Sequence, residues 1–303
     1  MSGSRQGPAL DRFRLLAAVL VVCNHTGPLD SLSPTADFFL TRVLARLAVP
    51  FFFIVSGYFL AKGQWKHTGR FLRKTLLLYL AAVALYLPLN WYNGGYSPLE
   101  WVKKLLADGT LYHLWYFPAV LLGVVVARNL ARLPHSAALG VAAVLYLIGV
   151  GGDSWYGLVS QAPALEELYG GIFQVFDYTR NGLFFAPLFL LLGAAGIQWS
   201  RRASAWGLAG SFAAMAAEAF FLRSQGWPRH DSMYLALPLV SVFLFSLLLG
   251  ATGAGTSGRP GCPCWSTCST PGLSCWSGAG RRYWGWRASW SGTAWGISAR
   301  CWC

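Results

Sequence analysis

The sequence predicts an all-α, polytopic transmembrane helix bundle of about eight helices over residues 8–251, followed by an irregular tail over residues 252–303. Three observations predict this fold class. Of the 303 residues, 55% are hydrophobic and only 12% are charged, whereas a soluble protein carries roughly a quarter charged residues. The mean hydropathy is +0.45. The apolar runs follow one another without a soluble interruption, and they are continuously apolar rather than alternating, which argues against a membrane barrel of strands.

Eight apolar runs are predicted to form the membrane helices. Several are shorter than the roughly 20 residues that a bilayer requires, so their ends are expected to extend into the flanking residues. The first run has a basic flank but no small-residue cleavage site after it, and it is therefore interpreted as a membrane helix and not as a signal peptide. The eight runs are Leu15–Thr26, Leu44–Ala61, Thr75–Trp91, Leu111–Val126, Ala137–Val150, Gly182–Ile197, Ala205–Leu222 and Met233–Gly250.

Charged residues alternate in sign between successive loops, and this alternation predicts the orientation. Because basic residues favour cytoplasmic loops, the N-terminus is predicted to be cytoplasmic. The basic set of loops holds Arg5, Arg12, Arg14, Lys62, Lys66, Arg70, Arg73, Lys74, Arg128, Arg132, Arg201 and Arg202. The opposite set holds Asp30, Asp37, Glu100, Asp108, Asp153, Glu166, Glu167, Asp177 and Asp231, and its longest loop, residues 151–181, is expected to cap an external vestibule. The net charge of +13 is thus interpreted as a topological signal and not as a nucleic-acid-binding surface.

The composition changes abruptly after about Thr252. Six of the seven cysteines and seven of the fifteen tryptophans lie between Gly261 and Cys303, with no acidic residue among them. A metal site is one interpretation, but the cysteines lack paired ligand spacing and any histidine; a disulfide scaffold is another. A third is a shifted reading frame, because GC-rich codons for this stretch, read two bases later, give Leu-Leu-Val-Tyr-Leu-Leu-His-Pro. We favour the frame shift, and expect no packed domain after residue 251. The cysteines in question are Cys262, Cys264, Cys268 and Cys275.

Arg14 and His25 are the first candidates for chemistry. Eleven residues are just over three helical turns, so both side chains face the same side of one helix, about 16 Å apart along its axis. An ionisable residue within a membrane span is costly and is a functional candidate by default, and histidine is the usual general base near neutral pH. The alternative is that His25 is a hydrogen-bonded core residue and Arg14 a cytoplasmic anchor.

Four motifs resemble those of the acyltransferase family 3 membrane proteins. Arg14, ten intervening residues and His25 resemble the Arg-x10-His pattern of the family's first helix. The motifs that follow in order are Arg46 to Tyr58 (Arg-Leu-Ala-Val-Pro-Phe-Phe-Phe-Ile-Val-Ser-Gly-Tyr), Arg70-Phe-Leu-Arg73, and His113-Leu114-Trp115-Tyr116. The resemblance covers roughly residues 8–250. The family has about ten helices, and its last helices commonly carry Tyr-Leu-x-His-Pro, which is close to the product of the shifted frame.

Two later segments resemble a subgroup of that family. They are Tyr178 to Leu188, which contains Arg180, Asn181 and Pro187, and Arg229 to Tyr234, which contains His230 and Asp231. The subgroup includes the membrane half of the serine racemases of vancomycin resistance. Those proteins carry a soluble pyridoxal-phosphate domain after the membrane part, and nothing in this chain resembles that domain. The resemblance therefore implies no racemase activity.

The resemblance implies a multi-pass enzyme of the bacterial plasma membrane that moves an acyl group, usually acetyl, from cytoplasmic acetyl-CoA or another acyl-CoA to a hydroxyl. The acceptor would be an envelope carbohydrate or another small hydroxylated molecule, with no bound cofactor or metal. His25 would be catalytic together with Arg14, and Arg70 and Arg73 would bind the donor. Residues expected to bind substrate are Arg46, Ser56, His113, Trp115, Tyr116, Arg180, Asn181 and Asp231.

Each of these roles has a simpler alternative. In that interpretation the arginines only set topology, Trp115 and Tyr116 form an interfacial aromatic belt, and the later residues form a solvated loop. There are also two rival interpretations of the function. One is a transport or substrate-binding membrane module, and the other is an inactive fragment.

Overall fold

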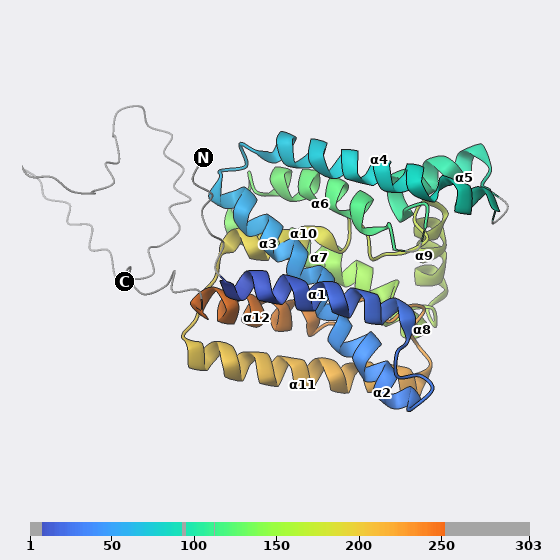
Figure 1. The fold of residues 1–303 in the computed structure, drawn as a ribbon. Coiled ribbons are helices and arrows are strands. Elements are labelled where there is room, and N and C mark those ends of the chain that lie inside the picture. The colour runs from blue at the N-terminus through green and yellow to red at the C-terminus, as the bar shows by residue number, and fades with distance from the viewer. Residues whose placement is uncertain (1–7, 93–94, 112, 252–303) are drawn as a thin grey trace, which may run out of the picture. The chain divides into compact units, whose positions relative to one another are not determined.

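The computed structural model describes residues 8–92, 95–111 and 113–251, and all regular elements in these ranges are helical (Figure 1). Each of the eight predicted runs contains one main helix, so the prediction of an all-α membrane bundle is confirmed. The predicted irregular tail lies outside the described residues. The eight helices are α1 (Pro8–Thr26), α3 (Ala48–Lys62), α4 (Thr68–Tyr92), α6 (Tyr116–Leu130), α7 (His135–Gly151), α10 (Ala186–Ala195), α11 (Arg201–Gln225) and α12 (Leu237–Ala251).

Shorter helices gather at the end of the bundle where α1 finishes (Figure 1). The stretch 151–181, predicted as a loop, in fact contains two of them. The prediction missed them because α8 has only four residues and α9 only thirteen, well short of a membrane span. The short elements are α2 (Pro34–Phe38), π-helix η1 (Phe39–Val43), 3₁₀-helix η2 (Leu44–Leu47), α5 (Pro98–Lys103), π-helix η3 (Lys104–Asp108), α8 (Tyr156–Val159) and α9 (Pro163–Val175).

Helix α10 forms the centre of the bundle, and most of its side chains are buried. A helix that is apolar on all sides is expected to be surrounded by others, and α10 packs against α3, α6, α7 and α12. Its approach to α3 depends on two glycines. An added Cβ would lie 2.0 Å from the Leu190 carbonyl oxygen at Gly57, and 2.0 Å from the Ile54 carbonyl oxygen at Gly193. Small residues allow such close backbone contact in membrane bundles.

Helices α4 and α11 lie on the periphery and expose apolar side chains. Leu78 of α4 is 63% exposed, Leu85 75%, and Trp206 of α11 80%. A continuous apolar face of this kind is unfavourable in water but is the expected surface of a helix in lipid. Within the described residues, three segments are long and apolar enough to cross a membrane: Pro34–Lys62, α4 and α11.

The connections between helices collect at two opposite ends of the bundle. The α3–α4 and α10–α11 connections lie where α1 begins, and the α1–α2 and α11–α12 connections lie where α1 finishes (Figure 1). The basic loop residues and the acidic loop residues identified in the sequence are therefore separated by the length of the helices. The candidate chemistry of the chain is divided between the same two ends.

The glycine contacts between α3 and α10 make the first testable prediction. In Gly193→Ala, the added methyl group meets backbone that cannot move aside, and such overpacking typically costs about 1–3 kcal/mol. We expect a lower midpoint of thermal unfolding for the purified chain in lipid nanodiscs. Gly210→Ala on α11 is the matched control, since nothing lies within 4 Å of its added Cβ. Equal midpoints for the two variants would contradict the close packing of α3 on α10.

Candidate functional site

A cavity of about 330 Å³ lies beside the last turns of α1. Its wall is assembled from segments far apart in the sequence: α1, the η2–α3 junction, residues 113–117, and the segments before α10 and α12. Six of the predicted site residues line it, namely His25, Arg46, His113, Trp115, Tyr116 and Arg180. The other lining residues are Ala18, Val21, Asn24, Ala45, Val49, Phe52, Phe117, Phe185 and Ser232.

His25 and His113 meet on this wall. Their ring centroids are 6.3 Å apart and the rings are nearly perpendicular, while His113 also contacts Tyr86 at 5.0 Å. His25 is in the last turn of α1 and is exposed rather than enclosed in the bundle. Next to it, the Oδ1 atom of Asn24 is buried with no hydrogen-bond partner among the described residues. The cavity wall thus combines an accessible imidazole with a buried acceptor atom.

Arg180 lines the cavity but is almost completely buried, with only 3% of its surface exposed. Its guanidinium is fixed by several contacts. Its Nη1 donates a hydrogen bond of 2.9 Å to the hydroxyl of Ser232. Its guanidinium also lies over two rings, 4.5 Å from the centroid of Tyr178 and 5.2 Å from that of Trp115. Such cation–π contacts fix the plane of the guanidinium. Trp115 therefore packs against a cation here, rather than serving only in an aromatic belt.

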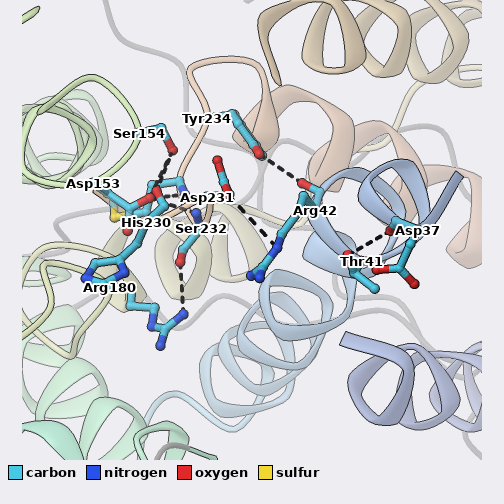
Figure 2. A network of polar contacts seen from close by, with 11 residues as sticks. Asp37, Thr41, Arg42, Asp153, Ser154, Arg180, His230, Asp231, Ser232 and Tyr234 are labelled. Atoms are coloured by element: carbon cyan, nitrogen blue, oxygen red, sulfur yellow. Dashed lines mark hydrogen bonds and ion pairs between the residues drawn. The ribbon is translucent and has the colours of Figure 1, made fainter. Parts of the chain in front are cut away.

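Asp153 fixes the loop that carries Ser232. This carboxylate is fully buried, and its Oδ1 accepts hydrogen bonds from the backbone N–H groups of Ser232 (2.7 Å) and Met233 (2.9 Å) and from the Ser154 hydroxyl (2.9 Å), as Figure 2 shows in part. Burial raises the pKa of Asp153 to about 6, against the opposing effects of these hydrogen bonds and of Arg180. This role was not predicted from the sequence, in which Asp153 is one acidic loop residue among several.

A second set of carboxylate contacts fixes the segment that carries Arg180. The Asp108 carboxylate accepts the backbone N–H of Asp177 at 3.0 and 3.1 Å. The Asp177 carboxylate in turn pairs with Lys103, at 2.6 Å, and with Lys104. Burial alone would raise the pKa of Asp177, but these two ion pairs outweigh it and hold that pKa below its ordinary value. Segment 177–181 is thereby tied to η3.

A smaller, polar hollow of about 150 Å³ adjoins the cavity, because Arg180 and Ser232 line both. Its other lining residues are Arg42, Arg229, His230 and Asp231. Asp231 pairs with Arg42 at 4.0 Å (Figure 2), and the ring of His230 lies 4.5 Å from that of Tyr178. Burial, with the nearby charges of Arg180 and Arg229, lowers the pKa of His230 to about 4, so this imidazole is neutral at pH 7.

The remaining predicted site residues lie elsewhere. Arg14 lines neither hollow and pairs with Asp11 at 2.8 Å. Ser56 is half-buried within α3, away from both hollows. Asn181 is buried, and its Oδ1 accepts the backbone N–H groups of Leu183 and Phe184, so its side chain shapes the turn before α10.

The two predicted donor-binding residues, Arg70 and Arg73, are exposed in the first turns of α4. The predicted residues thus form two groups at opposite ends of the bundle. Arg14 and His25 do not share a cavity, because His25 lines the one beside α1 and Arg14 does not.

Comparison with known proteins identifies the class of this chain. The sequence profile described as an acyltransferase domain, that of acyltransferase family 3, matches residues 8–270. The chain therefore belongs to this family, and with its apolar helices it is a membrane protein. No solved structure matches it.

Two relatives match most of this chain. An amino-acid racemase of Enterococcus faecalis is 40% identical over 270 residues, which cover 85% of this chain and 38% of that protein. A serine/alanine racemase of Enterococcus gallinarum is 40% identical over 257 residues, covering 79% of this chain and 37% of that protein. The chain thus spans well under half the length of these relatives.

Removing the Asp153 carboxylate tests whether it holds the site together. Asp153→Ala leaves two buried backbone N–H groups without an acceptor, at a cost of about 1–3 kcal/mol each. We expect a lower unfolding midpoint and faster hydrogen exchange in residues 228–236, measured by mass spectrometry in nanodiscs. Asp30→Ala, at an exposed position, is the control. Unchanged exchange in Asp153→Ala would refute the anchoring role.

Proposed function

We propose that this chain is a membrane O-acyltransferase that moves an acyl group, acetyl in the simplest case, from a cytoplasmic acyl-CoA to a hydroxyl of an envelope carbohydrate or another small hydroxylated acceptor. One observation carries the proposal: His25 and Arg180 share a cavity in a chain of the acyltransferase family. A general base beside a fixed cation is what acyl transfer to a hydroxyl requires.

In the proposed reaction, the acceptor hydroxyl lies beside His25 in the cavity, and His25 takes the hydroxyl proton. The acceptor oxygen attacks the acyl carbonyl carbon, the bond to sulfur breaks, and the coenzyme A thiolate leaves and takes up a proton. The guanidinium of Arg46 or Arg180 stabilises the negative charge on the carbonyl oxygen. A second route passes through an acyl intermediate on His25.

The donor is proposed to bind at the opposite end of the bundle. Arg14, Arg70 and Arg73 lie there, and guanidinium groups hold phosphates through paired, charge-assisted hydrogen bonds. The acyl group must then travel about the length of α1 to reach His25. The extended pantetheine arm of a coenzyme A donor is suited to that distance.

A second candidate is a transport or substrate-binding module, and one structural feature favours it. The segment Pro34–Lys62 is interrupted by the π-helix η1 and the 3₁₀-helix η2, which carry Arg42 and Arg46. Broken helices with polar groups are typical of transporter binding sites. The racemase names of the relatives are compatible with this candidate, because an amino acid is the substrate those names imply.

The orientation is also part of the proposal, with the N-terminus in the cytoplasm of a bacterial plasma membrane. In a variant without native cysteines, we expect Glu166→Cys to react with a membrane-impermeant maleimide in intact cells. Lys66→Cys should react only after the cells are opened. Both positions are exposed, so accessibility within the fold is matched. Labelling of position 66 in intact cells would reverse the assignment.

The role of His25 is tested by transfer of labelled acetyl from acetyl-CoA in membranes that contain the chain. A general base is typically worth about 10² to 10⁴ in rate, so His25→Ala should lose at least about a hundredfold of the transfer rate while membrane insertion is retained. His67→Ala, at an exposed position at the opposite end, is the control.

Each other result of this experiment decides against a part of the proposal. Full transfer by His25→Ala would exclude the catalytic role. Failure of that variant to insert would make His25 a structural residue. If the unaltered chain transfers no acetyl group, the acyltransferase proposal is wrong for this chain, and the fragment or the transport interpretation stands.

A further inference from the structure

The polar hollow beside the cavity is strongly basic. Three arginines line it, Arg42, Arg180 and Arg229, against one acidic residue, Asp231. His230 adds no charge, because it is neutral at pH 7. The adjoining cavity contributes Arg46, and no acidic side chain lines that cavity. The combined lining therefore carries four positive charges and one negative charge.

Two of the three arginines of the hollow are positioned by contacts with neighbouring side chains and backbone. Arg180 is fixed by Ser232 and by the rings of Tyr178 and Trp115. The guanidinium of Arg229 lies 3.6 Å from the ring centroid of Phe173, and its Nη1 donates to the carbonyl oxygen of Asp177. Preorganised guanidinium groups bind carboxylate and phosphate with little loss of side-chain entropy.

The basic hollow lies directly beside the cavity that contains His25, the proposed catalytic residue. Arg180 and Ser232 form the shared wall between the hollow and the cavity of His25. The hollow, at about 150 Å³, has room for several water-sized groups, which is enough for a single carboxylate or phosphate group. A molecule that placed such a group in the hollow would extend its remaining atoms along Arg180 into the cavity.

We infer that the hollow formed by Arg42, Arg180, Arg229 and Ser232 binds the anionic group of the acceptor, so that the acceptor is a small hydroxylated carboxylate or phosphate ester. This inference rests on the proposed function, since it assigns the acceptor class of the same site. The anion pairs with the guanidinium groups, and the acceptor hydroxyl extends toward His25.

Thermal unfolding of the purified full chain in nanodiscs tests the inference, at constant ionic strength. The probes are two matched pairs, L-lactate with L-lactamide and glycerol 3-phosphate with glycerol, in which only the anionic group differs. We expect at least one anion to raise the unfolding midpoint saturably and its neutral partner to have no effect. Stabilisation by lactate alone identifies a carboxylate site, and stabilisation by glycerol 3-phosphate alone identifies a phosphate site.

Variants locate the binding. Arg229→Gln and Arg42→Gln should each raise the half-saturating anion concentration about tenfold or more, because each removes a charge-assisted hydrogen bond. Arg223→Gln, an exposed arginine stacked on Phe38 outside the hollow, should leave that concentration unchanged. If Arg42→Gln does not fold, Arg229→Gln alone is sufficient for the test, because Arg229 is exposed and its replacement is expected to be tolerated. The inference is overturned if neither anion stabilises the chain, if the neutral partners stabilise it equally, or if Arg229→Gln binds like the control.

Anion binding and acetyl transfer, measured together, distinguish the anion-site inference from the acyltransferase proposal. His25→Ala should keep the anion affinity, because His25 does not line the hollow. Anion binding without any acetyl transfer by the unaltered chain would retain the site and reject the acyltransferase proposal. Transfer that depends on His25, without anion binding, would retain the enzyme and reject the anionic acceptor.

Discussion

The arrangement of the site depends on one buried carboxylate, that of Asp153. A buried charge is costly unless hydrogen bonds replace its lost hydration. Here one carboxylate oxygen receives two backbone N–H groups and one hydroxyl. These bonds join the end of α7 to the loop before α12, across 79 positions of sequence. They fix Ser232, whose hydroxyl accepts from Arg180, so the wall shared by the cavity and the polar hollow follows from this single carboxylate.

The bundle places polar groups mainly at its ends, as a lipid environment demands. Glu218 illustrates how the few polar groups on the helices are used: its carboxylate accepts the backbone N–H groups of Leu235 and Ala236 and the indole N–H of Trp155. The carboxylates of Glu218 and Asp153 both accept backbone N–H groups of the segment before α12 and so stabilise that turn. Arginines outnumber acidic residues in the linings of the cavity and of the polar hollow, and both linings are therefore positively charged on balance.

The sequence was sufficient to predict the helices and much of the cavity wall. The eight runs were predictable because continuous hydrophobicity specifies membrane helices almost regardless of detail. His25, Arg46, His113 and Arg180 were identified through motifs, and the fold brings them to one cavity although 155 positions separate the first from the last. Costly polar groups in or beside membrane helices mark such sites.

What could not be predicted depends on contacts between distant segments. Asp153 and Asp108 are two acids among nine in one set of loops, and only the folded chain shows which backbone groups they bind. Arg42 was not identified, since it belongs to none of the motifs, and Arg229 was regarded only as part of a resemblance. Asn181 was predicted to bind substrate, but its buried side chain is used in the turn before α10. The sequence did contain one indication of the role of Asp153. It is an isolated acidic residue soon after an apolar run, and an acid at the end of a membrane helix requires hydrogen-bond partners.

A double-mutant cycle on acetyl transfer tests most directly whether Asp153 acts through Arg180. The variants are Asp153→Asn, Arg180→Gln and their combination, compared in membranes at equal protein amount. If Asp153 acts by positioning Ser232 and hence Arg180, the double variant should lose about as much activity as the worse single variant, because interacting residues are not additive. Losses that simply multiply would show that the two residues act independently, and would contradict the central place of Asp153.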